Sequence, residues 1–149
     1  MIRPLPEEVL RYGKASTVEE SMWDHPFQWG SKRSGPDLAR VGNKYPNLWH
    51  YQHMKDPRSV TPNSIMPNYV WLERNNLDFM EIRKKVSVMH KLGVPYSQET
   101  LANADIEAEK QAKVIADDLV ANGAPAGLER KQIVALIAYL QALGQKGKK

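Results

Sequence analysis

The sequence predicts an all-α protein with long loops, and three observations lead to that fold class. Apolar residues recur at helical spacing through most of the second half, from Leu77 to Leu143. Prolines and glycines interrupt the first half, where the spacing is irregular. No stretch alternates apolar and polar residues with the two-residue period of a half-buried strand. The 149 residues contain no internal repeat and are expected to form a single domain over 1–149, ending in a disordered basic tail at 145–149.

Three short helices are expected in the first half. Proline and two acidic residues open a helix over 6–12, and a capping box opens another over 16–23. Residues 24–35 are expected to form an irregular loop. Asn47 then precedes a helix over 48–55 that it is expected to cap.

Longer helices are expected in the second half. One spans 77–92 with Asn76 as its cap, a second covers 106–122 after a possible cap at Ser97, and the last spans 128–143. Their apolar faces are expected to consist of Leu77, Met80, Ile82, Val86, Val88, Met89 and Leu92; of Val114, Ile115, Leu119 and Val120; and of Ile133, Leu136, Ile137, Leu140 and Leu143.

The charge distribution disfavours a nucleic-acid interface. The formal net charge is +4, and three of the lysines lie at the very end of the chain (Lys146, Lys148, Lys149), so subtracting three from four leaves +1 for the body. A nucleic-acid footprint needs basic side chains clustered on a folded face. We therefore predict no nucleic-acid partner; a binder would show steeply salt-dependent affinity.

Several chemistries are excluded by residue type. The chain has no cysteine, which rules out disulfides, thiolate catalysis and iron–sulfur ligation within it, and the haem-attachment motif Cys-x-x-Cys-His is absent. No nucleophile–base pair or phosphate-binding glycine loop stands out. His50 and His53, three residues apart, could share a helix face as two metal ligands, but no third ligand is evident. We interpret them as a surface or aromatic-packed pair.

The most distinctive stretch is Ser64–Tyr69, which contains Met66 immediately before Pro67. A residue that precedes proline is pushed out of the α region, so Met66 is expected on extended backbone. Such a thioether either covers a core or points at a metal as a soft ligand. Large aromatic rings gather in this half and need either a small core of their own or a flat apolar cofactor to pack against. They are Trp23, Phe27, Trp29, Tyr45, Trp49, Tyr51, Tyr69 and Trp71.

These residues resemble a known family. Gly35–Leu38, Arg40–Gly42, Tyr45, Trp49, Asp56–Pro57 and Ser64–Pro67 with Tyr69 are similar to the haem-enclosing half of class I cytochromes c, and Ile133–Gly144 is similar to their C-terminal helix. Met1–Pro4, Asp24–Arg33 leading into Gly35–Arg40, and Lys91–Tyr96 resemble, more narrowly, the mono-haem cytochrome c subunit of cbb3-type cytochrome c oxidases. The resemblance implies a cytochrome c-like helical domain with extra middle helices.

The resemblance also implies a site and a function. Met66 would be the distal axial ligand of a haem c iron, and the Pro36 carbonyl would orient the proximal histidine. Further cofactor-contacting candidates are Arg33, Arg40, Tyr45 and Trp49, for the haem propionates, and Ile65. Such a subunit passes single electrons from a cytochrome donor to the oxidase core, bound to other subunits at the periplasmic face of the bacterial inner membrane.

One departure from the family pattern sets a further expectation. In this family the Cys-x-x-Cys-His motif lies just before the residues that match Met1–Arg3, and a membrane-anchoring helix precedes it. The chain is therefore expected to be a soluble fragment that binds no haem and transfers no electrons. The alternative hypothesis is a cofactor-independent helical domain whose aromatic half docks a protein partner. A Cys-x-x-Cys-His upstream of Met1 in the gene would favour the cytochrome.

Overall fold

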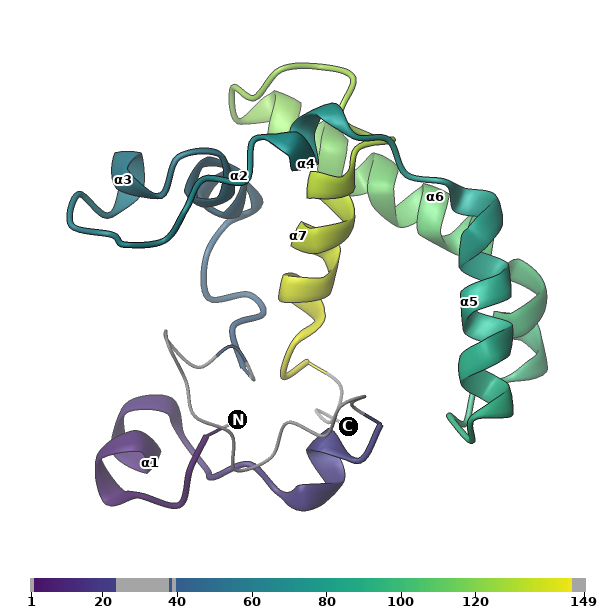
Figure 1. Cartoon of the computed structure of the whole chain (residues 1–149), viewed down its shortest axis with the longest axis horizontal. Coiled ribbons are helices and arrows are strands. Elements are labelled where there is room, and N and C mark those ends of the chain that lie inside the picture. The colour runs from purple at the N-terminus through teal and green to yellow at the C-terminus, as the bar shows by residue number, and fades with distance from the viewer. Residues whose placement is uncertain (1, 24–37, 39, 146–149) are drawn as a thin grey trace. The chain divides into compact units, whose positions relative to one another are not determined.

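The computed structural model describes residues 2–23, 38 and 40–145 and confirms the all-α class (Figure 1). Within these residues the extended pairing is limited to an isolated bridge between Asn76 and Lys131. The helices are α1 (Pro6–Tyr12), the 3-10 helix η1 (Val18–Ser21), α2 (Asn47–Lys55), α3 (Pro57–Val60), α4 (Trp71–Arg74), α5 (Phe79–Lys91), α6 (Gln98–Ala121) and α7 (Gln132–Ala142). The chain divides into two compact units, unit 1 (Met1–Lys44 and Leu140–Lys149) and unit 2 (Tyr45–Tyr139).

Unit 2 is organised around α6 and α7. Leu119 of α6 and Val134 and Ile137 of α7 are 0% exposed. The buried cluster also contains Tyr51, Phe79, Ala112, Ile115, Leu128 and Ile133. Burying this apolar surface is the main source of stability in the unit, since each large side chain removed from water contributes roughly 1.5–3 kcal/mol.

The buried face of α6 contains alanines where larger apolar side chains were predicted. Its buried stripe runs through Ala112, Ile115, Ala116 and Leu119, at intervals of three, one and three residues. Val114 lies off this stripe and is 69% exposed, and Val120 is 45% exposed. The prediction that these two valines face the core was wrong, because it favoured branched residues over the alanines that hold the helical register.

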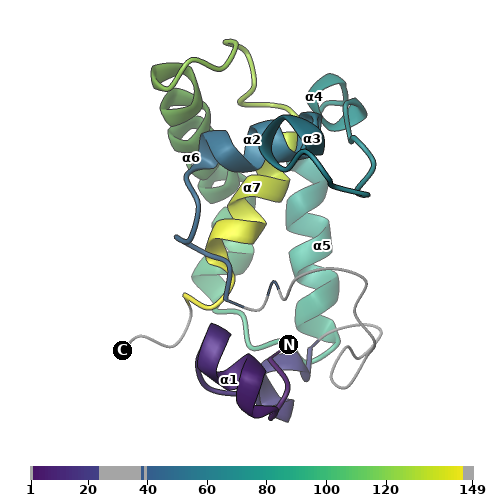
Figure 2. The ribbon, with the colours of Figure 1, turned by 90° about the vertical axis from the view of Figure 1, so that its left-hand side faces the viewer.

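Helices α5 and α6 run antiparallel as a hairpin (Figures 1 and 2). On α5 the less exposed residues are Phe79, Ile82, Val86 and Met89, again at helical spacing. Three residues predicted for the apolar face are instead exposed, namely Met80 (74%), Val88 (54%) and Leu92 (58%). The packed face of α5 is thus narrower than its apolar composition suggested.

The starts of α5 and α7 are joined by backbone hydrogen bonds. The Leu77 N–H donates to the Arg130 carbonyl at 2.7 Å, and the Gln132 N–H donates to the Asn75 carbonyl at 3.1 Å. The Asn76 side chain accepts a hydrogen bond from the Lys131 ammonium at 2.8 Å. Asn76 is therefore not the predicted helix cap; Asp78 is, and its carboxylate accepts the Met80 N–H at 2.9 Å.

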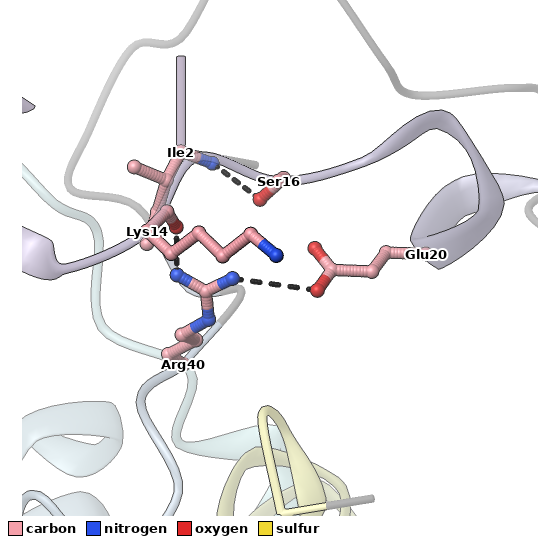
Figure 3. Close-up of polar contacts among 5 residues, drawn as sticks. All are labelled: Ile2, Lys14, Ser16, Glu20 and Arg40. Atoms are coloured by element: carbon pink, nitrogen blue, oxygen red, sulfur yellow. Dashed lines mark hydrogen bonds and ion pairs between the residues drawn. The ribbon is translucent and has the colours of Figure 1, made fainter. Parts of the chain in front are cut away.

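In unit 1 the residue Ile2, near the N-terminus, is hydrogen-bonded to the segment that follows α1. The Ile2 N–H donates to the Ser16 hydroxyl at 2.7 Å (Figure 3). The Ser16 N–H in turn donates to the Ile2 carbonyl at 2.8 Å. Ser16 therefore does not form the predicted capping box, and Thr17 occupies the cap position of η1 without a side-chain cap bond. The pairing leaves Ile2 1% exposed.

Residues 40–43 pack closely against residues 141–145 within unit 1. The Gly42 N–H donates to the Leu143 carbonyl at 3.0 Å, and the Gln145 side-chain amide donates to the Gly42 carbonyl at 2.8 Å. A Cβ added at Gly42 would lie 2.3 Å from the Gln141 carbonyl oxygen. Only glycine fits this backbone contact without displacing it.

Several other boundaries differ from the predictions. The capping role of Asn47 was wrong, since Pro46 occupies the cap position and the Asn47 amide donates to Asp118 at 2.9 Å. Ser97 does cap α6, by accepting the Thr100 N–H at 3.1 Å, but α6 begins at Gln98 rather than near 106. The short helices α3 and α4 were not predicted, and the expected irregular loop at 24–35 lies wholly outside the described residues.

Candidate functional site

Three side chains at four-residue spacing form a stack along α2 and the turn before it. The rings of Tyr45 and Trp49 are parallel, with centroids 4.0 Å apart and an interplanar angle of 15°. The Trp49 and His53 rings are parallel at 4.5 Å and 12°. Residues four apart on a helix share a face, which places Trp49 and His53 in one column. Tyr45, in the turn before α2, continues the column by stacking on Trp49. We call Tyr45, Trp49 and His53 the aromatic stack.

His50 lies against the edge of this stack and is 2% exposed. Its ring is nearly perpendicular to Trp49 (86°, centroids 5.3 Å apart) and to Tyr45 (88°, 6.1 Å). Burial, and to a lesser degree the nearby His53, lowers the pKa of His50, and burial lowers the pKa of His53. Both imidazoles are therefore held in the neutral form near pH 7.

Two ring nitrogens of this pair are buried without a hydrogen-bond partner among the residues that the structure describes. They are Nε2 of His50 and Nδ1 of His53. Buried polar side-chain atoms in folded proteins are nearly always paired. The interpretation of the two histidines as an aromatic-packed pair agrees with the ring contacts, but the spacing gave no sign that two nitrogens would be left unsatisfied.

Met66 lies on the segment that joins α3 to α4, in non-helical backbone as expected. Its side chain is half-buried, whereas the adjacent Ile65 is 93% exposed. The Tyr69 N–H donates to the Met54 carbonyl at 2.8 Å, which closes residues 54–69 into a loop that begins and ends at α2. We call residues 54–69 the Met66 loop.

Local hydrogen bonds shape the Met66 loop. The Asp56 carboxylate caps α3 by accepting the Arg58 N–H at 3.2 Å, and Pro57 occupies the first turn, where a missing N–H is harmless. The Ser64 hydroxyl accepts the Met66 N–H at 3.2 Å. The Asp56-Pro57 pair thus ends α2 and also starts the next short helix.

A polar network fixes α2 against α4. The Tyr51 hydroxyl donates to Glu73 Oε1 at 2.8 Å, and the Lys55 ammonium donates to the Tyr51 hydroxyl at 3.0 Å and to Glu73 at 3.2 Å. Burial acts to raise the pKa of Glu73, but the bonds from Tyr51 and Lys55 lower it overall. Glu73 is thus a carboxylate whose charge is already compensated.

The other predicted site residues are distributed as follows. Tyr45 and Trp49 lie together in the aromatic stack, and Ile65 and Met66 lie on the Met66 loop. Arg40 belongs to unit 1, where its guanidinium donates to the Lys14 carbonyl and to Glu20 at 3.3 Å (Figure 3). Arg33 and Pro36 lie outside the described residues, so their roles stay predictions.

Two negative findings apply to the described residues alone. None of the helices there is both long enough and apolar enough to cross a membrane. No group of three or more histidine, aspartate or glutamate side chains there could hold a metal ion.

Fold and site together define a class: an all-α protein in which a half-buried thioether and stacked aromatic rings belong to one helix and the loop closed onto it. The chain belongs to the family described as cytochrome c oxidase, mono-heme subunit/FixO, which it matches over residues 1–146. The resemblance recognised in the sequence is thereby confirmed, and the chain is a cytochrome c oxidase subunit of electron transport. A search of curated proteins found no match.

The residues present could supply one axial ligand of a haem iron, apolar surface for the ring and polar atoms for its carboxylates. A thioether is a soft ligand suited to haem iron, the aromatic stack offers flat apolar surface, and the unpaired imidazole nitrogens suit a polar group brought by a ligand. These residues do not supply covalent attachment of a haem, because the 149 residues contain no cysteine for a thioether link.

Proposed function

We infer that this chain forms the electron-transfer domain of the mono-haem subunit of a cbb3-type cytochrome c oxidase, with Met66 as one axial ligand of its haem c. The observation that carries the proposal is the placement of the Met66 thioether, half-buried on a loop that closes onto α2, the helix that carries Trp49 and His53 of the aromatic stack. When bound, the haem supplies a site that gains and loses one electron at a time.

The chain's own residues would hold the haem and set its potential. The soft sulfur of Met66 favours the reduced iron and so raises the reduction potential. Tyr45 and Trp49, with Arg33 and Arg40, are proposed to hold the haem carboxylates, and Ile65 to cover an apolar edge. The Pro36 carbonyl is proposed to accept a hydrogen bond from the proximal histidine, which keeps that ring oriented.

The proposal requires a motif that these 149 residues do not contain. Thioether attachment of a haem c needs two cysteines, and the proximal histidine follows them in the Cys-x-x-Cys-His motif, which these 149 residues lack. We therefore propose that the chain on its own is haem-free and inactive, and that the complete protein is anchored at the periplasmic face of the inner membrane. Its partners there would be the other oxidase subunits and a cytochrome electron donor.

The test uses the protein expressed from its complete gene in a host that attaches c-type haem. We expect one haem per chain and, in the oxidised state, the far-red absorption band that arises from a sulfur–iron bond. The Met66→Ala variant should lose this band, and Met54→Leu should keep it, since Met54 is packed against the core of unit 2. A cofactor-independent docking domain predicts no haem in any of these samples, and that outcome would reject the proposal.

A further inference from the structure

The two unsatisfied nitrogens on α2 are the feature that the proposed function does not use. His50 is 2% exposed, yet its Nε2 atom has no hydrogen-bond partner in the described part of the chain. The Nδ1 atom of His53, one turn further along α2, is also buried and has no hydrogen-bond partner among the described residues. Leaving a buried polar group unpaired is destabilising, so an arrangement with two of them indicates a partner from outside the described residues.

The surroundings restrict what that partner can be. The rings in contact with the pair, Tyr45 and Trp49, present faces and edges toward it and therefore bury it in apolar surface. The carboxylate of Glu73, which interacts with the same helix, is already bonded to Tyr51 and Lys55. A neutral imidazole can donate one N–H, so each unsatisfied nitrogen can serve a hydrogen-bond acceptor brought by a ligand.

The position of the pair connects it to the proposed ligand of the iron. His53 immediately precedes Met54, whose carbonyl accepts the Tyr69 N–H and closes the Met66 loop. The imidazoles thus lie on the helix from which the Met66 loop departs and to which it returns. A haem bound by Met66 carries two carboxylates, which are strong acceptors of hydrogen bonds from nitrogen.

We propose that His50, through Nε2, and His53, through Nδ1, donate hydrogen bonds to the carboxylate groups of the haem. This inference rests on the proposed function, and it adds neutral donors to the set read from the sequence. Arg40 differs from them because its guanidinium already contacts the Lys14 carbonyl and Glu20 within unit 1. Neutral donors would leave the haem carboxylates charged but hydrogen-bonded in an apolar surrounding.

The expected consequence is a change in reduction potential. Hydrogen bonds draw electron density from a carboxylate and weaken its stabilisation of the oxidised iron. Removing the donors should therefore lower the reduction potential while the Met66 sulfur stays on the iron. A purely structural role for the two rings predicts no such shift in protein that retains its haem and its sulfur–iron band.

The variants are made in the haem-loaded protein from the complete gene and compared by redox titration. His50→Leu and His53→Phe remove the donors, and the phenyl ring keeps the stacking on Trp49. His50→Gln and His53→Asn place an amide N–H near the same ring nitrogens and should restore the potential. His90→Gln is the matched control, because His90 lies on a different helix, α5. Its Nδ1 atom is 3.3 Å from the Val94 carbonyl oxygen.

The outcomes separate this inference from the function on which it rests. Lower potentials in His50→Leu or His53→Phe, with recovery in the amide variants, support it. Potentials equal to wild type in variants that retain the sulfur–iron band overturn it and leave the proposed function standing. If His50→Leu yields no folded protein, His53→Phe and His50→Gln decide by the same criterion. A wild-type protein without haem rejects both.

Discussion

The α6–α7 core and the α2 segment of unit 2 bury their side chains in different ways. In the core, Leu119, Val134 and Ile137 are 0% exposed and carry no polar side-chain atoms. On α2, His50 is almost as deeply buried, but its Nε2 atom has no partner among the described residues. The Met66 loop, which closes onto the same helix, leaves Ile65 93% exposed.

The difference indicates that the two regions serve different purposes. The core is satisfied by the chain itself, since apolar groups need only each other. The α2 segment instead breaks the rule that buried polar atoms are paired. Real proteins break such rules mainly at functional sites, where a ligand completes the arrangement.

Truncation of the core should produce the largest effect. Ile137→Ala removes a fully buried side chain, and we expect the free energy of unfolding to fall by about 2–5 kcal/mol. Denaturant titration measures this change. Val114→Ala on α6 is the control, because Val114 is 69% exposed, and its effect should stay within about 0.5 kcal/mol. Equal effects of the two variants would show that the core is misassigned.

Removal of an unsatisfied polar group should raise the free energy of unfolding rather than lower it. In the 149-residue chain without haem, His50→Leu is expected to raise the free energy of unfolding by about 1 kcal/mol, because an unpaired buried nitrogen is lost. Tyr51→Phe is the comparison, since its hydroxyl is hydrogen-bonded to Glu73, and its loss should lower stability by about 1 kcal/mol. A fall in stability for both variants would mean that His50 has a partner.

Acid should weaken the α2 segment before most carboxylates are protonated. Burial lowers the pKa of His50 and of His53 in the folded state. The unfolded chain therefore takes up protons first, and the free energy of unfolding should fall as the pH drops below about 6.5. Thermal unfolding between about pH 7 and pH 5.5 measures the slope. The double variant His50→Leu, His53→Phe should have a flatter slope, and an unchanged slope would exclude the pair as its source.

The smallest effect is expected at Ile65. Because the side chain is 93% exposed, Ile65→Ser should alter the stability of the haem-free chain by less than about 0.5 kcal/mol. In the haem-loaded protein the same substitution admits water to the haem edge and should lower the reduction potential. A large loss of stability in the haem-free chain would show that Ile65 packs against protein.

Much of the fold could be read from the sequence, for physical reasons. Proline at the start of α1 and glycine after α1, α5 and α6 define helix ends through backbone conformations that few other residues adopt, with φ of 94°, 100° and 96° at Gly13, Gly93 and Gly123. What failed were choices that depend on tertiary contacts. Asn47 and Asn76 look like caps, but Asp118 and Lys131 engage their side chains instead.

The site was predictable only in part. Proline after Met66 excludes a helix interior, and the four-residue spacing of Trp49 and His53 on α2 implies a shared face, so both features follow from local rules. The unsatisfied nitrogens of His50 and His53 do not, because whether a buried ring nitrogen finds a partner depends on tertiary contacts that spacing does not reveal. The i, i+3 spacing of the two histidines was visible, but a satisfied aromatic-packed pair has the same spacing.

The central claim is that the sulfur of Met66 binds haem iron, and iron X-ray absorption of the haem-loaded protein tests it most directly. The spectrum is recorded for the wild type and for Met66→Ala in the oxidised and reduced states. We predict a sulfur scatterer at bonding distance from the iron in the wild type and none in the variant. A sulfur signal that survives the substitution, or its absence from the wild type, would contradict the claim.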